Sequence, residues 1–119
     1  MKYMYERYWG IFHDNSSTIV GCGYSGAASA LNDIHKQNLA KVGPLPAGLY
    51  TIAEVYDDPE RGQHTCMLEP ARSNIMYGRS GFLIHGDTKE EAHNASEGCI
   101  VAPYWVRHLF KAGDEIEVI

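Results

Sequence analysis

The chain has 119 residues, a formal net charge of −5 and ordinary shares of apolar (45%) and charged (21%) residues, which fits one globular domain over residues 1–119. The negative charge and the lack of any basic run argue against nucleic-acid binding, because nothing would neutralise the phosphates. No window approaches the ~20 apolar residues of a membrane span, and residues 1–10 lack the apolar stretch of a secretory signal, so work outside the cytoplasm would need another machine to export the protein.

In the first third of the chain, short apolar runs separated by turn residues favour a mainly β fold. Strands are predicted over residues 8–12 and 18–22, joined as a hairpin by the turn 13–17, whose Asp, Asn and Ser side chains can bond their own backbone. Residues 27–39 are the strongest candidate for a helix, because apolar side chains recur at helical spacing and Ser25 precedes them as a possible cap.

The rest of the chain also indicates strands. Residues 43–48 must be irregular, since two prolines and two glycines interrupt helices and sheet ladders alike. A charged turn is predicted over residues 57–60, and one or two helical turns over residues 105–110. The further predicted strands cover residues 49–55, 65–69, 81–85, 100–101 and 115–119.

Two segments place a reactive side chain at a predicted strand edge beside a glycine: Phe82-Leu83-Ile84-His85-Gly86-Asp87 and Ser96-Glu97-Gly98-Cys99-Ile100-Val101. A thiol with the usual pKa of about 8.5 is only a few per cent ionised near neutral pH. Cys99 therefore needs a base, and His85 is the candidate. Backbone N–H groups at Gly98 and Cys99 could form an oxyanion hole, with Ser96 fixing the loop.

Spacing alone supports a purely structural role for Cys99 and His85 as well as it supports a catalytic one. Cys99 could be a small buried apolar residue and His85 a structural histidine. A metal site is disfavoured, because the six histidines are scattered and the cysteines form no Cys-x-x-C pair. An odd cysteine count leaves at least one free thiol in a monomer, and Cys22 and Cys66 could pair in an oxidising compartment.

Taken together, the two segments resemble the active-site signature of L,D-transpeptidase catalytic domains, in which a histidine–glycine pair precedes a serine-x-glycine-cysteine motif. The resemblance is closest to the small L,D-transpeptidase-like effectors of bacterial type VI secretion systems. Three further motifs similar to that branch occur in order, so that the match spans residues 24–101: Tyr24-Ser25-Gly26, Gly43-Pro44-Leu45-Pro46-Ala47-Gly48 and Arg79-Ser80-Gly81-Phe82.

The resemblance implies an L,D-transpeptidase-like β-sandwich or barrel with one or two short helices. It implies Cys99 as nucleophile and His85 as general base, with no metal or organic cofactor. The residues implied to form the oxyanion hole or support the motif are Gly98, Ser96, Gly86 and Asp87. Those implied to contact substrate are Tyr24, Ser25 and Arg79.

Two positions depart from the larger L,D-transpeptidases. Those enzymes usually carry histidine before the glycine–cysteine pair, where this chain has Glu97, and arginine two positions after the cysteine, where it has Val101. Valine cannot replace a guanidinium that binds a carboxylate with two hydrogen bonds. Arg79 or Arg107 could serve instead.

The implied reaction is attack by Cys99 on a tetrapeptide stem of peptidoglycan, with loss of the terminal D-alanine and formation of a thioester. Water as acceptor gives an L,D-carboxypeptidase, whereas a D-amino acid or a stem amine gives a transpeptidase. The partners implied are peptidoglycan stem peptides, secretion machinery and a cognate immunity protein. The expected place of action is the periplasm of a target bacterium.

Two other classes of function stay open at this point. A cysteine amidase or endopeptidase would also use a thiol and an imidazole, although those folds commonly place cysteine before histidine in the chain. A non-catalytic binding module of a phage or secretion apparatus would need neither group to react.

Overall fold

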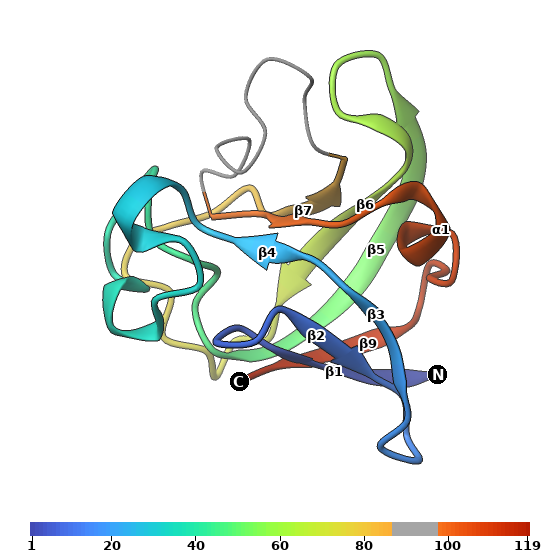
Figure 1. Cartoon of the computed structure of the whole chain (residues 1–119), viewed down its shortest axis with the longest axis horizontal. Helices are drawn as coiled ribbons and strands as arrows, with labels where there is room; N and C mark the ends of the chain where they lie inside the picture. Colours follow the sequence, from blue (N-terminus) through green and yellow to red (C-terminus); the bar gives the residue numbers. More distant parts are fainter. Residues whose placement is uncertain (87–97) are drawn as a thin grey trace.

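The computed structural model describes residues 1–86 and 98–119 and shows a mainly β fold (Figure 1). Within these residues, nine strands form one sheet in the order β3-β2-β1-β9-β5-β6-β7-β8-β4. The strands are β1 Lys2–Glu6, β2 Ile11–His13, β3 Ile19–Cys22, β4 Tyr24–Ser25, β5 Gly48–Asp58, β6 Gly62–Pro70, β7 Leu83–His85, β8 Ile100–Val101 and β9 Glu115–Val118. The helical elements are two 3₁₀ turns, Ala28–Ala30 and Ile34–Lys36, and helix α1, Tyr104–Arg107.

The sheet curls so far that its two edge strands, β3 and β4, are consecutive in the sequence. Strands β3 and β4 stand at opposite ends of the strand order, yet only Gly23 separates them in sequence (Figure 1). The Gly23 N–H donates to the Gly10 carbonyl oxygen over 2.8 Å. A Cβ at Gly23 would lie 2.3 Å from the Val101 carbonyl oxygen, so only glycine fits where the edges meet. The barrel-like, mainly β fold expected from the sequence is confirmed.

One core of aliphatic and aromatic side chains fills the interior of this sheet. Phe12 stands at its centre, with ring centroids 4.6 Å from Tyr5 and 5.2 Å from Phe110. Ile84 of β7 and Ile100 of β8 are fully buried in the same core. Burying each such side chain contributes about 1.5–3 kcal/mol, so β7 and β8 are held on a rigid support.

Most predicted strands are present. The hairpin of β2 and β3 pairs Ile11 with Cys22. The strands predicted over 49–55 and 65–69 are longer than expected and pair with each other as β5 and β6, so that Asp57 and Asp58 of the predicted turn lie in β5. Residues 43–47 are irregular as expected, while Gly48 already belongs to β5, and α1 is a single turn where one or two helical turns were predicted. Strand β1 was missed, although Tyr3 and Tyr5 alternate with exposed or half-buried neighbours, and the predicted strand 8–12 overlaps the turn before β2.

The predicted helix over residues 27–39 is wrong. The chain makes two separate 3₁₀ turns there, because Asn32 adopts a left-handed backbone conformation with φ of 56°, which interrupts a helix. The Asn32 side chain accepts a hydrogen bond from the Ser25 N–H over 3.0 Å. Ser25 itself lies in β4, so it does not cap a helix. In residues 1–86 and 98–119, no helix is long and apolar enough to cross a membrane.

Candidate active site

Strands β7 and β8 run parallel and side by side, with Ile84 opposite Ile100 and His85 opposite Val101. Successive side chains of a strand point to opposite faces, so the buried isoleucines fix the direction of their neighbours. His85 and Val101 therefore point away from Ile84 and Ile100. The register places His85 at the end of β7 and Cys99 directly before the adjacent strand β8.

The sulfur of Cys99 is partly exposed and lies against the chain that leads into β7. The Leu83 N–H donates to Sγ over 3.3 Å, and Sγ lies 3.9 Å from the Gly81 carbonyl oxygen. An N–H donor at a sulfur favours the thiolate over the thiol. Cys99 is thus both reachable and provided with a hydrogen bond that stabilises its anion.

A groove of about 280 Å³ shares Gly81 and Leu83 with the surroundings of this sulfur, although Cys99 itself is not among its lining residues. Gly81 and Leu83, which contact Cys99, form one part of its wall. The remainder is mainly apolar and comes from β5, β6 and Phe82. Its lining residues are Ala53, Met67, Leu68, Glu69, Pro70, Gly81, Phe82 and Leu83.

The imidazole of His85 is held in a defined orientation and is only 4% exposed. Its Nδ1 lies 2.8 Å from the Gly86 carbonyl oxygen. A carbonyl oxygen can only accept, so Nδ1 carries the proton and Nε2 of the neutral ring is a proton acceptor. The His85 carbonyl oxygen accepts from the Ala102 N–H over 2.9 Å, which ties the residue to the end of β8.

Gly98 occupies a position that no other residue fits. Its φ is 121°, and a Cβ there would lie 2.2 Å from Arg79 Nη2 and 2.8 Å from the ring of Phe82. Both the backbone conformation and the close approach of the guanidinium therefore require glycine before the cysteine. This explains the glycine of the Gly98-Cys99 pair in structural terms.

Ser25 is fully buried directly behind Gly98. Its hydroxyl accepts from the Leu45 N–H over 2.8 Å and donates to the Gly98 carbonyl oxygen over 3.1 Å. The side chain thus links the two upstream motifs to the peptide before Cys99. Tyr24, its neighbour, is 8% exposed and pairs through its backbone with Val101.

Arg79 braces the same peptide from the other side. Its guanidinium donates to the carbonyl oxygens of Gln37, Pro44 (2.8 Å) and Gly43 (2.9 Å), and its central carbon lies 5.3 Å from the centre of the Phe82 ring. Burial lowers the pKa of Arg79, while the nearby Tyr50 and Cys99 act in the opposite direction. The residue joins the segment 37–44 to the strand that leads to His85.

Arg107 of helix α1, the second candidate to replace the missing arginine, is 5% exposed. It donates through Nη1 to the Ala102 carbonyl oxygen over 2.6 Å, and through Nε and Nη2 to the Gln63 carbonyl oxygen over 3.1 and 2.8 Å. Its guanidinium is therefore directed at backbone, like that of Arg79, and is placed to hold strand ends together.

Asp58 and Tyr56, at the end of β5, are close enough to His85 and Cys99 to interact with them electrostatically, which the sequence did not reveal. The N–H groups of Arg61 and Glu60 keep the pKa of Asp58 below its usual range, and the charges of Arg61 and His85 act in the same direction. Burial, followed by the charge of Asp58, raises the pKa of Tyr56, to which Cys99 also contributes. The sequence showed only an ordinary charged turn here, with no local pattern that connects it to the histidine.

Some predicted site residues cannot be placed. Asp87 and Ser96, together with Glu97, lie outside the described residues. All three cysteines carry free thiols, so the possible pairing of Cys22 with Cys66 does not occur in this structure. Among residues 1–86 and 98–119, no group of three or more His, Cys, Asp or Glu side chains is arranged to hold a metal ion.

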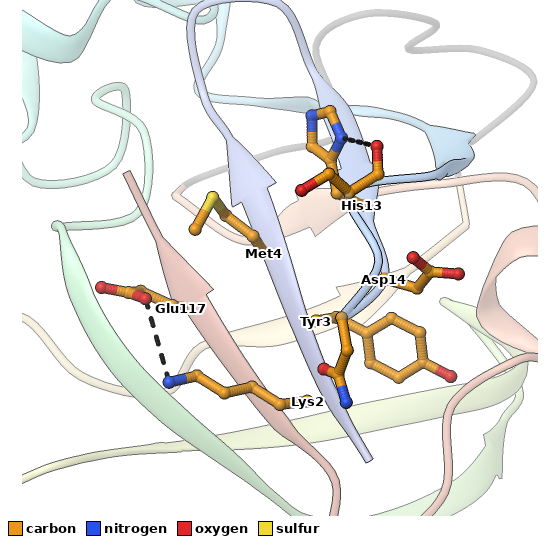
Figure 2. A pocket seen from close by; sticks show the side chains of 8 residues that line it. Lys2, Tyr3, Met4, His13, Asp14 and Glu117 are labelled. Carbon is orange, nitrogen blue, oxygen red and sulfur yellow. Dashed lines mark hydrogen bonds and ion pairs between the residues drawn. The ribbon is translucent and has the colours of Figure 1, made fainter.

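A larger hollow, of about 350 Å³, lies elsewhere, over β1, β9 and the turn after β2 (Figure 2). It contains an ion pair between Lys2 and Glu117 at 4.0 Å and a contact of 3.4 Å between His13 Nδ1 and the Ser17 carbonyl oxygen. It has no thiol, and none of the predicted site residues lines it. The chemistry therefore favours the smaller groove beside Cys99.

Comparison with known proteins identifies a family for most of the chain. The model of the Tlde1 domain family matches residues 20–111, which is well over half of the chain and includes both His85 and Cys99. No curated protein shows significant similarity to the chain.

Proposed function

The chain belongs to the Tlde1 domain family of type VI secretion L,D-transpeptidase effectors, and from this premise we propose that it is a cysteine enzyme that edits the tetrapeptide stems of peptidoglycan. Cys99 is the nucleophile and His85 the general base. The reaction removes or exchanges the terminal D-alanine, as an L,D-carboxypeptidase or L,D-transpeptidase.

The observation that carries this proposal is the arrangement of β7 and β8. It is supported by the register of the two strands, which brings the end of β7 with His85 beside the start of β8, directly after Cys99, and by the Leu83 N–H 3.3 Å from the sulfur. In the neutral ring, the contact between His85 Nδ1 and the Gly86 carbonyl oxygen favours the tautomer with the proton on Nδ1, in which Nε2 can accept a proton as a base must. The groove lined by Gly81 and Leu83, the two residues in contact with the sulfur, is the place where we expect a peptide to bind.

In the first step, His85 Nε2 takes the thiol proton and the Cys99 thiolate attacks the carbonyl carbon of the third stem residue. The bond to the D-alanine nitrogen breaks, and the imidazolium returns its proton to that leaving amine. The product is a thioester between Cys99 and the shortened stem. The thiol proton leaves with D-alanine and the oxidation state of sulfur does not change, so this step needs no metal and no redox partner.

In the second step, an acceptor attacks the thioester carbon and Cys99 leaves as the thiolate. His85 takes a proton from the acceptor as it attacks. Water gives a tripeptide, a free D-amino acid gives an exchanged stem, and a stem amine gives a cross-link. Loss or exchange of D-alanine removes the donor stems that cross-linking needs, which suits an antibacterial effector.

The effector family points to secretion machinery as a partner and to a target cell as the place of action. We propose the periplasm of that cell, where peptidoglycan is accessible. A cognate immunity protein that blocks the groove beside Cys99 would protect the producing cell.

The test is incubation of the purified protein with tetrapeptide muropeptides, followed by mass spectrometry. The proposal predicts loss of a single D-alanine, or its replacement by an added D-amino acid. Cleavage at an amide elsewhere in the stem would instead indicate an amidase or endopeptidase. No change, under conditions in which an active relative works, would contradict the enzymatic assignment.

A further inference from the structure

We propose that Arg107 is a positioning residue for His85, which holds the Gly86 carbonyl oxygen in place as the acceptor for His85 Nδ1. This inference rests on the proposed role of His85 as base. It assigns a task to a buried charge on helix α1 that touches neither the sulfur nor the groove beside it.

Arg107 joins three strand ends that meet around the histidine. Nη1 donates over 2.6 Å to the carbonyl oxygen of Ala102, and the N–H of Ala102 donates over 2.9 Å to the carbonyl oxygen of His85. Nε and Nη2 both donate to the carbonyl oxygen of Gln63, at the start of β6. One guanidinium therefore sets the position of β6 relative to the residue that pairs with the His85 backbone.

Gly86 is enclosed between this guanidinium and the tip of the hairpin β5–β6. Its N–H donates to the Arg61 carbonyl oxygen over 2.8 Å. A Cβ at Gly86 would lie 3.0 Å from Arg107 Nη1 and 3.1 Å from the Arg61 carbonyl oxygen. The peptide after His85 is thus fixed from two sides, and glycine at this position leaves room for the guanidinium.

The orientation of this peptide decides which ring nitrogen of His85 is protonated. While the Gly86 carbonyl oxygen faces Nδ1, the proton stays there and Nε2 accepts. If the peptide turns away, Nδ1 loses its acceptor and the tautomer with the proton on Nε2 becomes populated. That tautomer cannot take a proton from the thiol at Nε2, so turnover falls although neither catalytic group has been altered.

A pair of conservative variants separates positioning from general stability. Arg107→Lys keeps the charge but loses the planar fork that reaches two carbonyl oxygens at once. The matched control is Arg7→Lys, since Arg7 is also 5% exposed and also donates to backbone carbonyl oxygens, those of Ile119 (2.9 Å) and Leu45 (3.3 Å). Both variants lose a buried guanidinium, and only the guanidinium of Arg107 lies next to Gly86.

We expect Arg107→Lys to lower kcat at least about tenfold with KM within about twofold, and ¹⁵N NMR of the histidine side chain to show a shift toward the tautomer protonated at Nε2. Arg7→Lys should keep both kcat and the wild-type tautomer. An unchanged tautomer in folded Arg107→Lys, or an equal loss of kcat in both variants, would overturn the proposal.

Two features keep this test decisive. The NMR measurement needs no turnover, so it reports on Arg107 even if the wild-type protein leaves muropeptides unchanged, which would count against the proposed function alone. If Arg107→Lys does not fold, Gly86→Ala keeps the guanidinium in the chain but crowds it, because the new Cβ would lie 3.0 Å from Arg107 Nη1. The same tautomer shift is then expected, and its absence would refute the role of Arg107.

Discussion

The hydroxyl of Ser25 donates to the carbonyl oxygen of Gly98 over 3.1 Å, across 73 positions of the chain. The same hydroxyl accepts from the Leu45 N–H, so a single buried side chain connects the tyrosine-serine-glycine motif, the proline-glycine motif and the peptide before Cys99. The upstream motifs are therefore part of the support of the site. Ser25, which the family resemblance placed at the substrate, lies behind the chain that carries the nucleophile.

Replacing Ser25 by alanine should destabilise the fold. The substitution leaves the buried Leu45 N–H and Gly98 carbonyl oxygen without this partner, which costs about 1–3 kcal/mol of unfolding free energy. Chemical denaturation measures the change. The control is Ser16→Ala in the exposed turn after β2, where a change within about 0.5 kcal/mol is expected. Equal stability of the two variants would show that the buried hydroxyl contributes nothing.

Gly98→Ala should lower the free energy of unfolding by more than backbone strain alone would. A suitable control is Gly113→Ala, because Gly113 has a φ of 95° and no atom within 4 Å of its missing Cβ. That control should lose about 1–2 kcal/mol of unfolding free energy, because alanine is strained in a left-handed conformation. Gly98→Ala adds the overlap with Arg79 Nη2 and should lose clearly more, together with activity. Similar losses in both variants would mean that the guanidinium can move aside freely.

The three thiols should differ in reactivity toward an alkylating agent. Burial raises the pKa of the fully buried Cys66 to about 12, so this thiol should react most slowly. Cys22 is exposed but lies outside the groove. Cys99, which accepts the Leu83 N–H, should react fastest at pH 7. Peptide mapping after a short alkylation gives the order, and preferential labelling of Cys22 would count against an activated Cys99.

Stability should fall at alkaline pH. Burial raises the folded-state pKa of Cys66 from 9.0 to about 12, and it also raises the pKa values of Tyr5 and Tyr50. The folded protein then holds protons that the unfolded chain has already lost, so the free energy of unfolding decreases as pH rises above about 9. Denaturation at a series of pH values tests this. Cys66→Val should flatten the decline, whereas Cys22→Ser should not, and identical curves for both would exclude Cys66 as a cause.

Local sequence patterns predicted the first hairpin and the two reactive segments, because alternation and turn residues act over a few positions. They failed over residues 27–39, where Asn32 bonds the Ser25 backbone and adopts a left-handed conformation against the helical spacing. They connected neither Asp58 with His85 nor Arg107 with the backbone around it, since these relationships arise only through the pairing of distant strands. The proposed catalytic pair and several of its neighbours could be named from motifs, but the contacts that make Ser25 and Arg79 supports could not.

The central claim is that Cys99 forms a covalent bond with the shortened stem. Intact-protein mass spectrometry after rapid mixing with a tetrapeptide muropeptide tests it most directly. We expect an adduct equal in mass to the substrate minus D-alanine, located on Cys99, and none on a folded Cys99→Ala protein. Release of D-alanine by that variant at the wild-type rate, or an adduct on another residue, would contradict it.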